Sequence, residues 1–291
     1  MDGDDAASVR AADADLRPVP VPAAGPPWRC PTCRLPLHED AASAWCDDGH
    51  RIDRAREGYL HLLPAGRLKG RIPGDTAEML AARRALFDEG HYRPVQTAVA
   101  AAVAARRPGV VLDAGCGEGT YLAAVDAPAR LGIDIAKPGI RLAARRWPAC
   151  RFAVASSFQL PVDDATVDAV VSVFAPRAFA EFGRVLRPGG VAVLASPGPD
   201  HLRGLVELIY GEARPHEQRP HTADDPELPS AAVHRVRVRY DLALRTPGAV
   251  AALVRMTPYW WKATAAQQAD LVARPGLDTV VDVIVTVHEL A

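Results

Sequence analysis

From residue 110 onward, short apolar runs alternate with segments of helical composition. The runs that we predict to be strands are residues 110–112, 130–133, 152–154, 167–173, 191–194 and 280–287. The segments that we predict to be helices are residues 77–87, 94–106, 137–146, 178–186 and 202–210. Such alternation is typical of a parallel sheet with helices on both faces. We therefore expect residues 108–291 to form an α/β domain with a doubly wound sheet.

The first 107 residues follow a different pattern. Residues 1–27 are rich in Ala, Asp and Pro and are predicted to be a disordered leader. Residues 28–64 are short and carry cysteines, which indicates a small metal-binding domain. Residues 65–107 are predicted to be a linker followed by helices, and the proline-rich residues 213–229 to be a mobile excursion.

Composition and charge exclude some classes of protein. The longest uninterrupted apolar run, residues 98–105, has 8 residues, far fewer than the roughly 18 to 20 that a membrane-spanning helix needs. The acidic N-terminus does not fit a secretory signal, so we expect a cytoplasmic protein. The net charge of -1 gives no general indication of nucleic-acid binding, although residues 28–107 carry 13 basic against 10 acidic residues.

Three of the five cysteines lie within 17 positions. Cys30, Cys33, Cys46 and His50 have the spacing C-x2-C-x12-C-x3-H, which supplies the four soft ligands of a tetrahedral zinc ion. The sequence therefore predicts a closed, structural zinc site, with His38 as an alternative fourth ligand. A domain of this size needs the ion to fold.

A glycine-rich turn follows the first predicted strand of the α/β region. Gly115, Gly117 and Gly119 allow the backbone to approach a ligand closely. Asp113, at the end of the strand, suits an ammonium group, and Asp134, at the end of the next strand, suits two ribose hydroxyls. A ligand with a ribose and an ammonium group but no phosphate is S-adenosylmethionine.

Several motifs together resemble one family. They are Cys30-Pro31-Thr32-Cys33, Glu57-Gly58-Tyr59-Leu60-His61-Leu62-Leu63-Pro64, Gly90-His91-Tyr92, Asp113-Ala114-Gly115-Cys116-Gly117-Glu118-Gly119 and Ser196-Pro197-Gly198-Pro199-Asp200-His201-Leu202. In addition, Leu186-Arg187-Pro188-Gly189-Gly190 resembles the turn that commonly opens the fifth strand of class I methyltransferases. Across residues 28–291 the chain resembles the RlmA family, which are zinc-containing 23S rRNA (guanine-N1)-methyltransferases. The resemblance implies a class I methyltransferase fold, a Rossmann-like doubly wound sheet with a small N-terminal zinc-binding domain.

The resemblance also implies functional residues and partners. It implies that Tyr92, Tyr121, Leu122 and His201 contact S-adenosylmethionine and that the substrate is a 23S rRNA hairpin. Arg67, Lys69 and Arg71 are candidate phosphate contacts. Whether the activity is of the housekeeping or the macrolide-resistance type stays open, as does a homodimer.

Methylation at N1 requires that the N1 proton leave. The candidate general bases are His201, Asp200 and Glu181. Two other functions remain open: a small-molecule methyltransferase of secondary metabolism that retains the zinc module, and a nucleic-acid-binding adaptor with a silent cofactor pocket.

Overall fold

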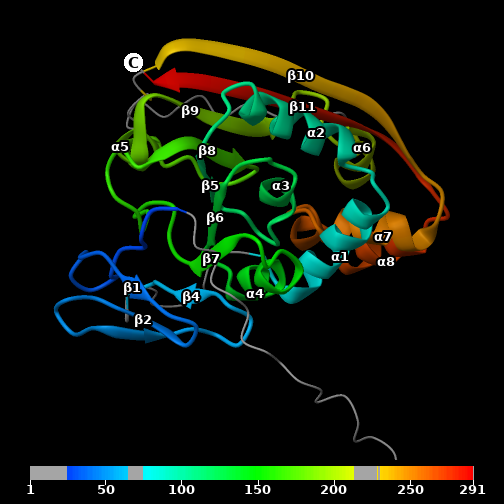
Figure 1. The fold of residues 1–291 in the computed structure, drawn as a ribbon. Coiled ribbons are helices and arrows are strands. Elements are labelled where there is room, and N and C mark those ends of the chain that lie inside the picture. Colours follow the sequence, from blue (N-terminus) through cyan, green and yellow to red (C-terminus); the bar gives the residue numbers. More distant parts are fainter. Residues whose placement is uncertain (1–24, 65–74, 213–227, 229, 291) are drawn as a thin grey trace, which may run out of the picture.

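A twisted sheet of eight strands runs through the centre of the computed structural model, which describes residues 25–64, 75–212, 228 and 230–290 (Figure 1). Its strands are β4 (Leu60–His61), β5 (Val110–Ala114), β6 (Ala129–Asp134), β7 (Arg151–Val154), β8 (Val167–Val173), β9 (Leu186–Pro197), β10 (Ser230–Leu244) and β11 (Leu277–Leu290). They lie in the order β10-β11-β9-β8-β5-β6-β7-β4. All neighbours are parallel except that β11 is antiparallel to both β9 and β10. The order reverses between β5 and β8, and ligands of open α/β sheets bind at such a point.

Helices cover both faces of this sheet. They are α1 (Ala77–Asp88), α2 (Arg93–Ala104), α3 (Thr120–Ala123), α4 (Lys137–Arg146), α5 (Phe179–Val185), α6 (Arg203–Tyr210), α7 (Pro247–Arg255) and α8 (Ala265–Ala273). Helix α5 lies on the same face as the N-terminal region, and most of the others lie on the opposite face. The valines of α2 and the side chains of Tyr92 and Tyr121 share one apolar core with β5, β8 and β9. Within the described residues, no helix has the length and apolar character needed to cross a membrane.

The face that carries α5 is covered largely by the N-terminal region. Strands β1 (His38–Glu39), β2 (Ser43–Trp45) and β3 (Arg51–Asp53) form a small antiparallel sheet, which we call the ribbon together with its flanking residues 28–64. Trp28 and Leu37 of the ribbon share a second apolar core with Phe179 and Phe182 of α5. Residues 155–166, all of them described, connect β7 to β8 without a helix, and the ribbon packs where such a helix would lie.

Backbone hydrogen bonds fix the ribbon in place. The N–H of Arg29 donates to the carbonyl of Pro161 at 2.8 Å, and the N–H of Leu62 donates to the carbonyl of Val154 at 2.8 Å. Strand β4 adds a short parallel strand to the edge of the large sheet, beside β7. The ribbon and the methyltransferase-like region therefore share both a core and a sheet, and their exact boundary stays a prediction.

The sequence predicted the central elements well. All six expected strands and all five expected helices are present, and α4 has the expected bounds. Strand β10, helix α7 and helix α8 were not predicted. Strand β10 was missed because it forms the outer edge of the sheet and exposes Val233 and Val236 by 43% and 54%. The expected leader, linker and excursion lie mostly outside the described residues, as do Arg67, Lys69 and Arg71.

Candidate cofactor pocket and metal centre

The four predicted metal ligands come together within the ribbon. The ligand atoms of Cys30, Cys33, Cys46 and His50 all lie within 4.8 Å of one another. Sγ of Cys46 lies 3.6 Å from Sγ of Cys33 and 3.4 Å from Nδ1 of His50. A tetrahedral ion with Zn–S bonds of roughly 2.3 Å requires ligand separations of about 3.8 Å. The cluster therefore fits zinc, with all four positions filled by protein.

His38, the alternative ligand, lies outside this cluster. Its Nε2 is 3.0 Å from Oδ1 of Asp47, and both side chains are exposed. Two turns shape the actual site: the N–H of Arg34 donates to the carbonyl of Cys30 at 3.0 Å, and the N–H of Gly49 donates to the carbonyl of Cys46 at 2.9 Å. Each turn directs its two ligand side chains toward one point.

The glycine-rich turn lies where β5 ends, at the point of reversal in the sheet. Gly115, Gly117 and Gly119 have φ of 92°, 55° and 78°, a region that residues with a Cβ rarely adopt. A Cβ on Gly115 would lie 2.5 Å from Cβ of Ala175. The sequence therefore needs glycine here both for the backbone conformation and for the close approach of the 174–176 segment.

Asp134 shapes the same turn. Its Oδ2 accepts from the N–H of Gly117 at 2.9 Å and its Oδ1 from the N–H of Ala136 at 2.7 Å. Each carboxylate oxygen has further acceptor capacity, so the group can still accept ribose hydroxyls. The position agrees with the predicted ribose contact, which stays a prediction.

Asp113 is buried without a partner. It is 1% exposed, and neither carboxylate oxygen accepts a hydrogen bond from the described residues. Burial, together with a smaller contribution from the nearby Asp134 carboxylate, raises the pKa of Asp113 to about 8. A buried acid without a partner is costly, and an ammonium group supplies the missing charge and donors. The orphaned carboxylate is the observation that fits S-adenosylmethionine to this pocket.

Two tyrosine hydroxyls are also left unpaired. Tyr92 and Tyr121 are buried, and their hydroxyl oxygens have no partner among the described residues. Both rings pack around Phe87, at centroid distances of 5.5 Å and 5.8 Å. Burial raises the pKa of both phenols above the ordinary value, so they act as neutral hydrogen-bonding groups. Leu122, the remaining predicted contact on this side, is fully buried in the same core.

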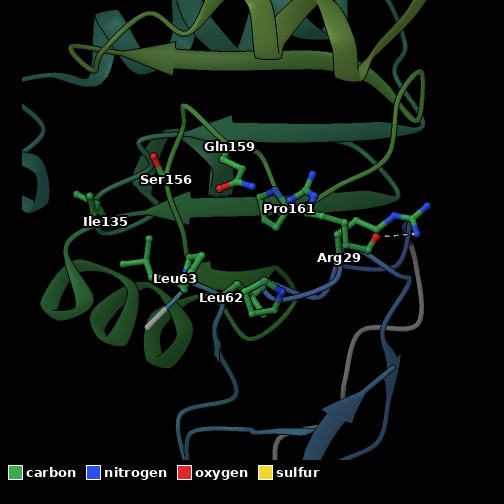
Figure 2. A pocket seen from close by; sticks show the side chains of 10 residues that line it. Arg29, Leu62, Leu63, Ile135, Ser156, Gln159 and Pro161 are labelled. Atoms are coloured by element: carbon green, nitrogen blue, oxygen red, sulfur yellow. Dashed lines mark hydrogen bonds between the residues drawn. The ribbon is translucent and has the colours of Figure 1, made fainter. Parts of the chain in front are cut away.

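A second pocket lies between the ribbon and the carboxyl ends of β6 and β7. Leu62 and Leu63 lie across it from Ser156 and Gln159 (Figure 2). Ile135, which follows Asp134 directly, forms another wall. The zinc-bearing turn contributes Pro31 and Arg34 to the lining of this pocket, whose further lining residues are Arg29, Pro64 and Pro161.

The turn at residues 197–202, where β9 ends, holds Asp200 and His201. Nδ1 of His201 accepts from the backbone N–H of Asp282 at 3.2 Å. The ring of His201 lies 5.6 Å from that of Phe174, which has a φ of 52° and is 44% exposed. Such backbone strain in an exposed aromatic residue points to a functional constraint.

Asp282 holds this turn, and the sequence analysis missed it. Its carboxylate is fully buried, receives two hydrogen bonds from Arg237 at 2.8 Å and 2.9 Å, and accepts from the N–H of Asp200 at 2.9 Å. The Arg237 guanidinium lowers the pKa of Asp282. The available signal was an acidic residue inside the otherwise apolar run of β11.

The three candidate bases have different surroundings. Oδ2 of Asp200 lies 3.4 Å from both Arg237 and Arg239. Glu181 pairs with Arg184 at 2.7 Å and accepts from the N–H of Leu160 at 2.6 Å. These contacts place Glu181 on the ribbon side of the sheet, whereas Asp200 and His201 share one turn.

A metal prediction follows from the ligand geometry. The purified protein should contain one zinc per chain, and Cys46→Ala should reduce the metal content to near zero because three ligands leave the tetrahedron open. Elemental analysis by mass spectrometry measures both. His38→Ala is the matched control and should retain the zinc, and loss of metal in this variant would assign the fourth ligand to His38.

A second prediction concerns proton release at Asp113. With a pKa of about 8, the free carboxyl is largely protonated at pH 7, and an ammonium ligand favours its ionised form. Binding of S-adenosylhomocysteine should therefore release close to one proton at pH 7, and affinity should rise with pH between 6 and 8. Calorimetry in buffers of different ionisation enthalpy measures the release. Asp113→Asn should bind weakly without this release, and a wild-type proton count near zero would contradict the assignment.

Two protein-family models match the chain. One, described as "RlmA, N-terminal" and modelling a zinc ribbon, matches residues 28–70, and one described as "Methyltransferase domain" matches residues 111–190. Together they cover the ribbon, the metal centre and the glycine-rich turn. The class I methyltransferase fold and the use of S-adenosylmethionine are thereby supported from both sequence and geometry.

Three curated relatives extend over most of the chain. The 23S rRNA (guanine(748)-N(1))-methyltransferase of Streptomyces fradiae is 36% identical, over 87% of this chain and 92% of that protein. Relatives named for 23S rRNA (guanine-N1) methylation in Micromonospora griseorubida and Bacillus subtilis are 44% and 32% identical, covering 63% and 88% of this chain and 70% and 94% of theirs. The chain belongs to the RlmA family of zinc-containing, S-adenosylmethionine-dependent 23S rRNA (guanine-N1)-methyltransferases.

Proposed function

We propose that this protein methylates N1 of a guanine in a hairpin of 23S rRNA. The observation that carries the proposal is that relatives acting on 23S rRNA match the ribbon and the methyltransferase region together, over 87% of this chain. Guanine 748, named for the Streptomyces fradiae relative, is the first position to examine. A change in macrolide susceptibility on expression would distinguish the resistance type from the housekeeping type.

The chemistry places three demands on the pocket. Guanine N1 carries a weakly acidic proton, and its loss shifts negative charge onto O6. Bound S-adenosylmethionine supplies an electrophilic methyl group on its sulfonium. The protein must therefore stabilise charge at O6, accept or relay the N1 proton, and hold an unpaired base in line with that methyl group.

His201 is suited to the first demand. Because Nδ1 accepts from the Asp282 N–H, the neutral ring carries its proton on Nε2 and acts there as a donor. In this tautomer the ring donates to a developing O6 anion and does not accept the N1 proton. Asp200, on the same turn, is the proposed proton acceptor, and Glu181 is already engaged by Arg184 and Leu160.

Phe174 is suited to holding the base. Its ring is exposed and lies beside His201 at the end of β8, and the next residue, Ala175, contacts Gly115 of the cofactor turn. An aromatic face at this place supports a stacked guanine close to the methyl donor. The adenine of the cofactor is proposed to lie at the pocket of Ile135 and Ser156.

The first functional prediction is a modified nucleotide in rRNA. Expression in a bacterium that lacks this modification should give 23S rRNA with one new stop for reverse transcriptase, because N1-methylguanine blocks Watson–Crick pairing. Asp113→Asn, expressed at the same level, is the control and should give no stop. Absence of any stop with the wild-type protein would remove the RNA function and favour the small-molecule methyltransferase.

The second functional prediction separates two roles of His201. His201→Asn keeps an acceptor near the Asp282 N–H but removes the donor at Nε2. If the donor stabilises O6, kcat should fall by about 10²-fold, as on loss of one oxyanion donor, while the affinity for S-adenosylhomocysteine stays at the wild-type value. A loss of cofactor affinity with little change in kcat would instead support the direct cofactor contact that the family resemblance implies.

A further inference from the structure

A row of cations connects helix α4 to the ribbon. Lys137, Arg141 and Arg145 are exposed and spaced four residues apart, so they share one face of the helix. Arg56 of the ribbon lies beside them and is 62% exposed, against 45% for Arg141 and 49% for Arg145. We call these four residues the α4 stripe.

One buried acid organises the stripe. Oε1 of Glu57 accepts from Arg141 at 2.8 Å, from Arg145 at 3.1 Å and from Arg56 at 3.1 Å. Three positive charges therefore converge on a single negative charge, and Lys137 adds a fourth. Each guanidinium carries five N–H groups and donates one of them to Glu57. This hydrogen bond holds the plane of the guanidinium in position and leaves its other donors directed outward.

Helix stability accounts for only part of this arrangement, because Arg145 lies in the last turn of α4, where a cation is favourable to the macrodipole, whereas Lys137 does not. A cation in the first turn of a helix opposes the macrodipole by about 0.3 to 1 kcal/mol, and Lys137 is the first residue of α4. Arginines that share one carboxylate oxygen also repel one another. The excess positive charge is costly for the free protein and favourable only beside an anion.

The position and length of the α4 stripe indicate what kind of anion it binds. Helix α4 follows Asp134 almost directly, so the stripe begins at the rim of the cofactor pocket. From Lys137 to Arg145 the helix extends about 12 Å, at roughly 1.5 Å per residue, and Arg56 continues the charge onto the ribbon. A line of cations of this length fits successive phosphates of one strand better than a single phosphate ion.

We propose that the α4 stripe binds the phosphodiester backbone of the RNA substrate and guides its target base toward the cofactor pocket. This inference rests on the proposed rRNA function and assigns the contact to residues of both the ribbon and the methyltransferase region. The ribbon thus contributes to substrate binding as well as to folding, through Arg56 and through Glu57, which positions the arginines of α4.

The test is the salt dependence of RNA binding. The stripe variant is the triple substitution Lys137→Gln/Arg141→Gln/Arg145→Gln. Glu57 keeps its pair with Arg56 in this variant, so the buried acid still has a cationic partner. The dissociation constant for a 23S rRNA transcript is measured for the wild type and the variant at several concentrations between about 50 and 300 mM KCl. The slope of log affinity against log salt should be smaller in the variant than in the wild type by about 2 to 3, because each lost phosphate contact removes roughly 0.7 to 0.9. Zinc content and affinity for S-adenosylhomocysteine should match the wild type.

A matched control changes the net charge equally at other sites. Arg187→Gln/Arg245→Gln/Arg274→Gln removes two exposed arginines and one half-buried arginine, which pair with Asp168, Asp278 and Asp270. Its slope should stay within about 0.5 of the wild-type slope, by analogy with loss of less than one contact. Arg141→Lys/Arg145→Lys keeps the charge and should retain the wild-type slope.

The outcomes distinguish this inference from the proposed function. A wild-type slope in the stripe variant, or an equal decrease in the control, overturns the inference even if the wild-type protein methylates rRNA. A loss of zinc or of cofactor affinity in the stripe variant would show a structural role instead and would also overturn it. If the wild-type protein neither binds nor methylates the transcript, the proposed function fails, and the inference fails with it.

Discussion

The packing of the ribbon against an open sheet face is the constraint on which the rest of the structure depends. The connection from β7 to β8 has no helix, so the apolar side chains of these strands need cover from elsewhere. A segment of this size cannot bury a sufficient core by itself. The ribbon therefore covers the open face of the sheet, and the sheet supplies the apolar core of the ribbon. Zinc would hold together the two turns of the ribbon that carry its ligands. The buried contact of Glu39 with Arg151, at the start of β7, adds a charged link inside this interface.

This packing also determines the shape of the cofactor side. Because the ribbon is held to the 155–166 connection by Arg29 and Arg34, the zinc-bearing turn forms part of the pocket beside Ile135. At the end of β5, burial is the main cause of the raised pKa of Asp113, and the nearby Asp134 carboxylate adds to it. The free pocket thus holds a buried carboxyl without a hydrogen-bond partner among the described residues, which is the feature that the proposed ammonium contact would satisfy.

Local spacing predicted those parts of the molecule that depend on few neighbours in the sequence. The zinc ligands and the glycine-rich turn were confirmed as clusters because their residues lie within 21 and 5 positions. Asp282 and Arg237 were missed because their role exists only after β10 and β11 pair and place both beside residues 197–202. Strand β4 was missed for a similar reason, since two residues carry no periodicity and gain their strand character from pairing with β7. Long-range pairing, and not local propensity, determines these elements.

Glu57 shows how one residue can join structure to recognition. As a buried carboxylate it needs cationic partners, and it takes them from both the ribbon and α4. One guanidinium would satisfy its charge, so the second and third are in excess and their charge is available to a polyanion. On the opposite side of the pocket, Asp282 binds Arg237 and in the same way fixes the turn that carries His201. In both places a buried acid positions outward-facing groups around the pocket. The two sets lie on opposite sides of the sheet's point of reversal. In the proposed complex the α4 stripe would hold the phosphates on one side of the target base, and the 197–202 turn would face its reactive edge on the other.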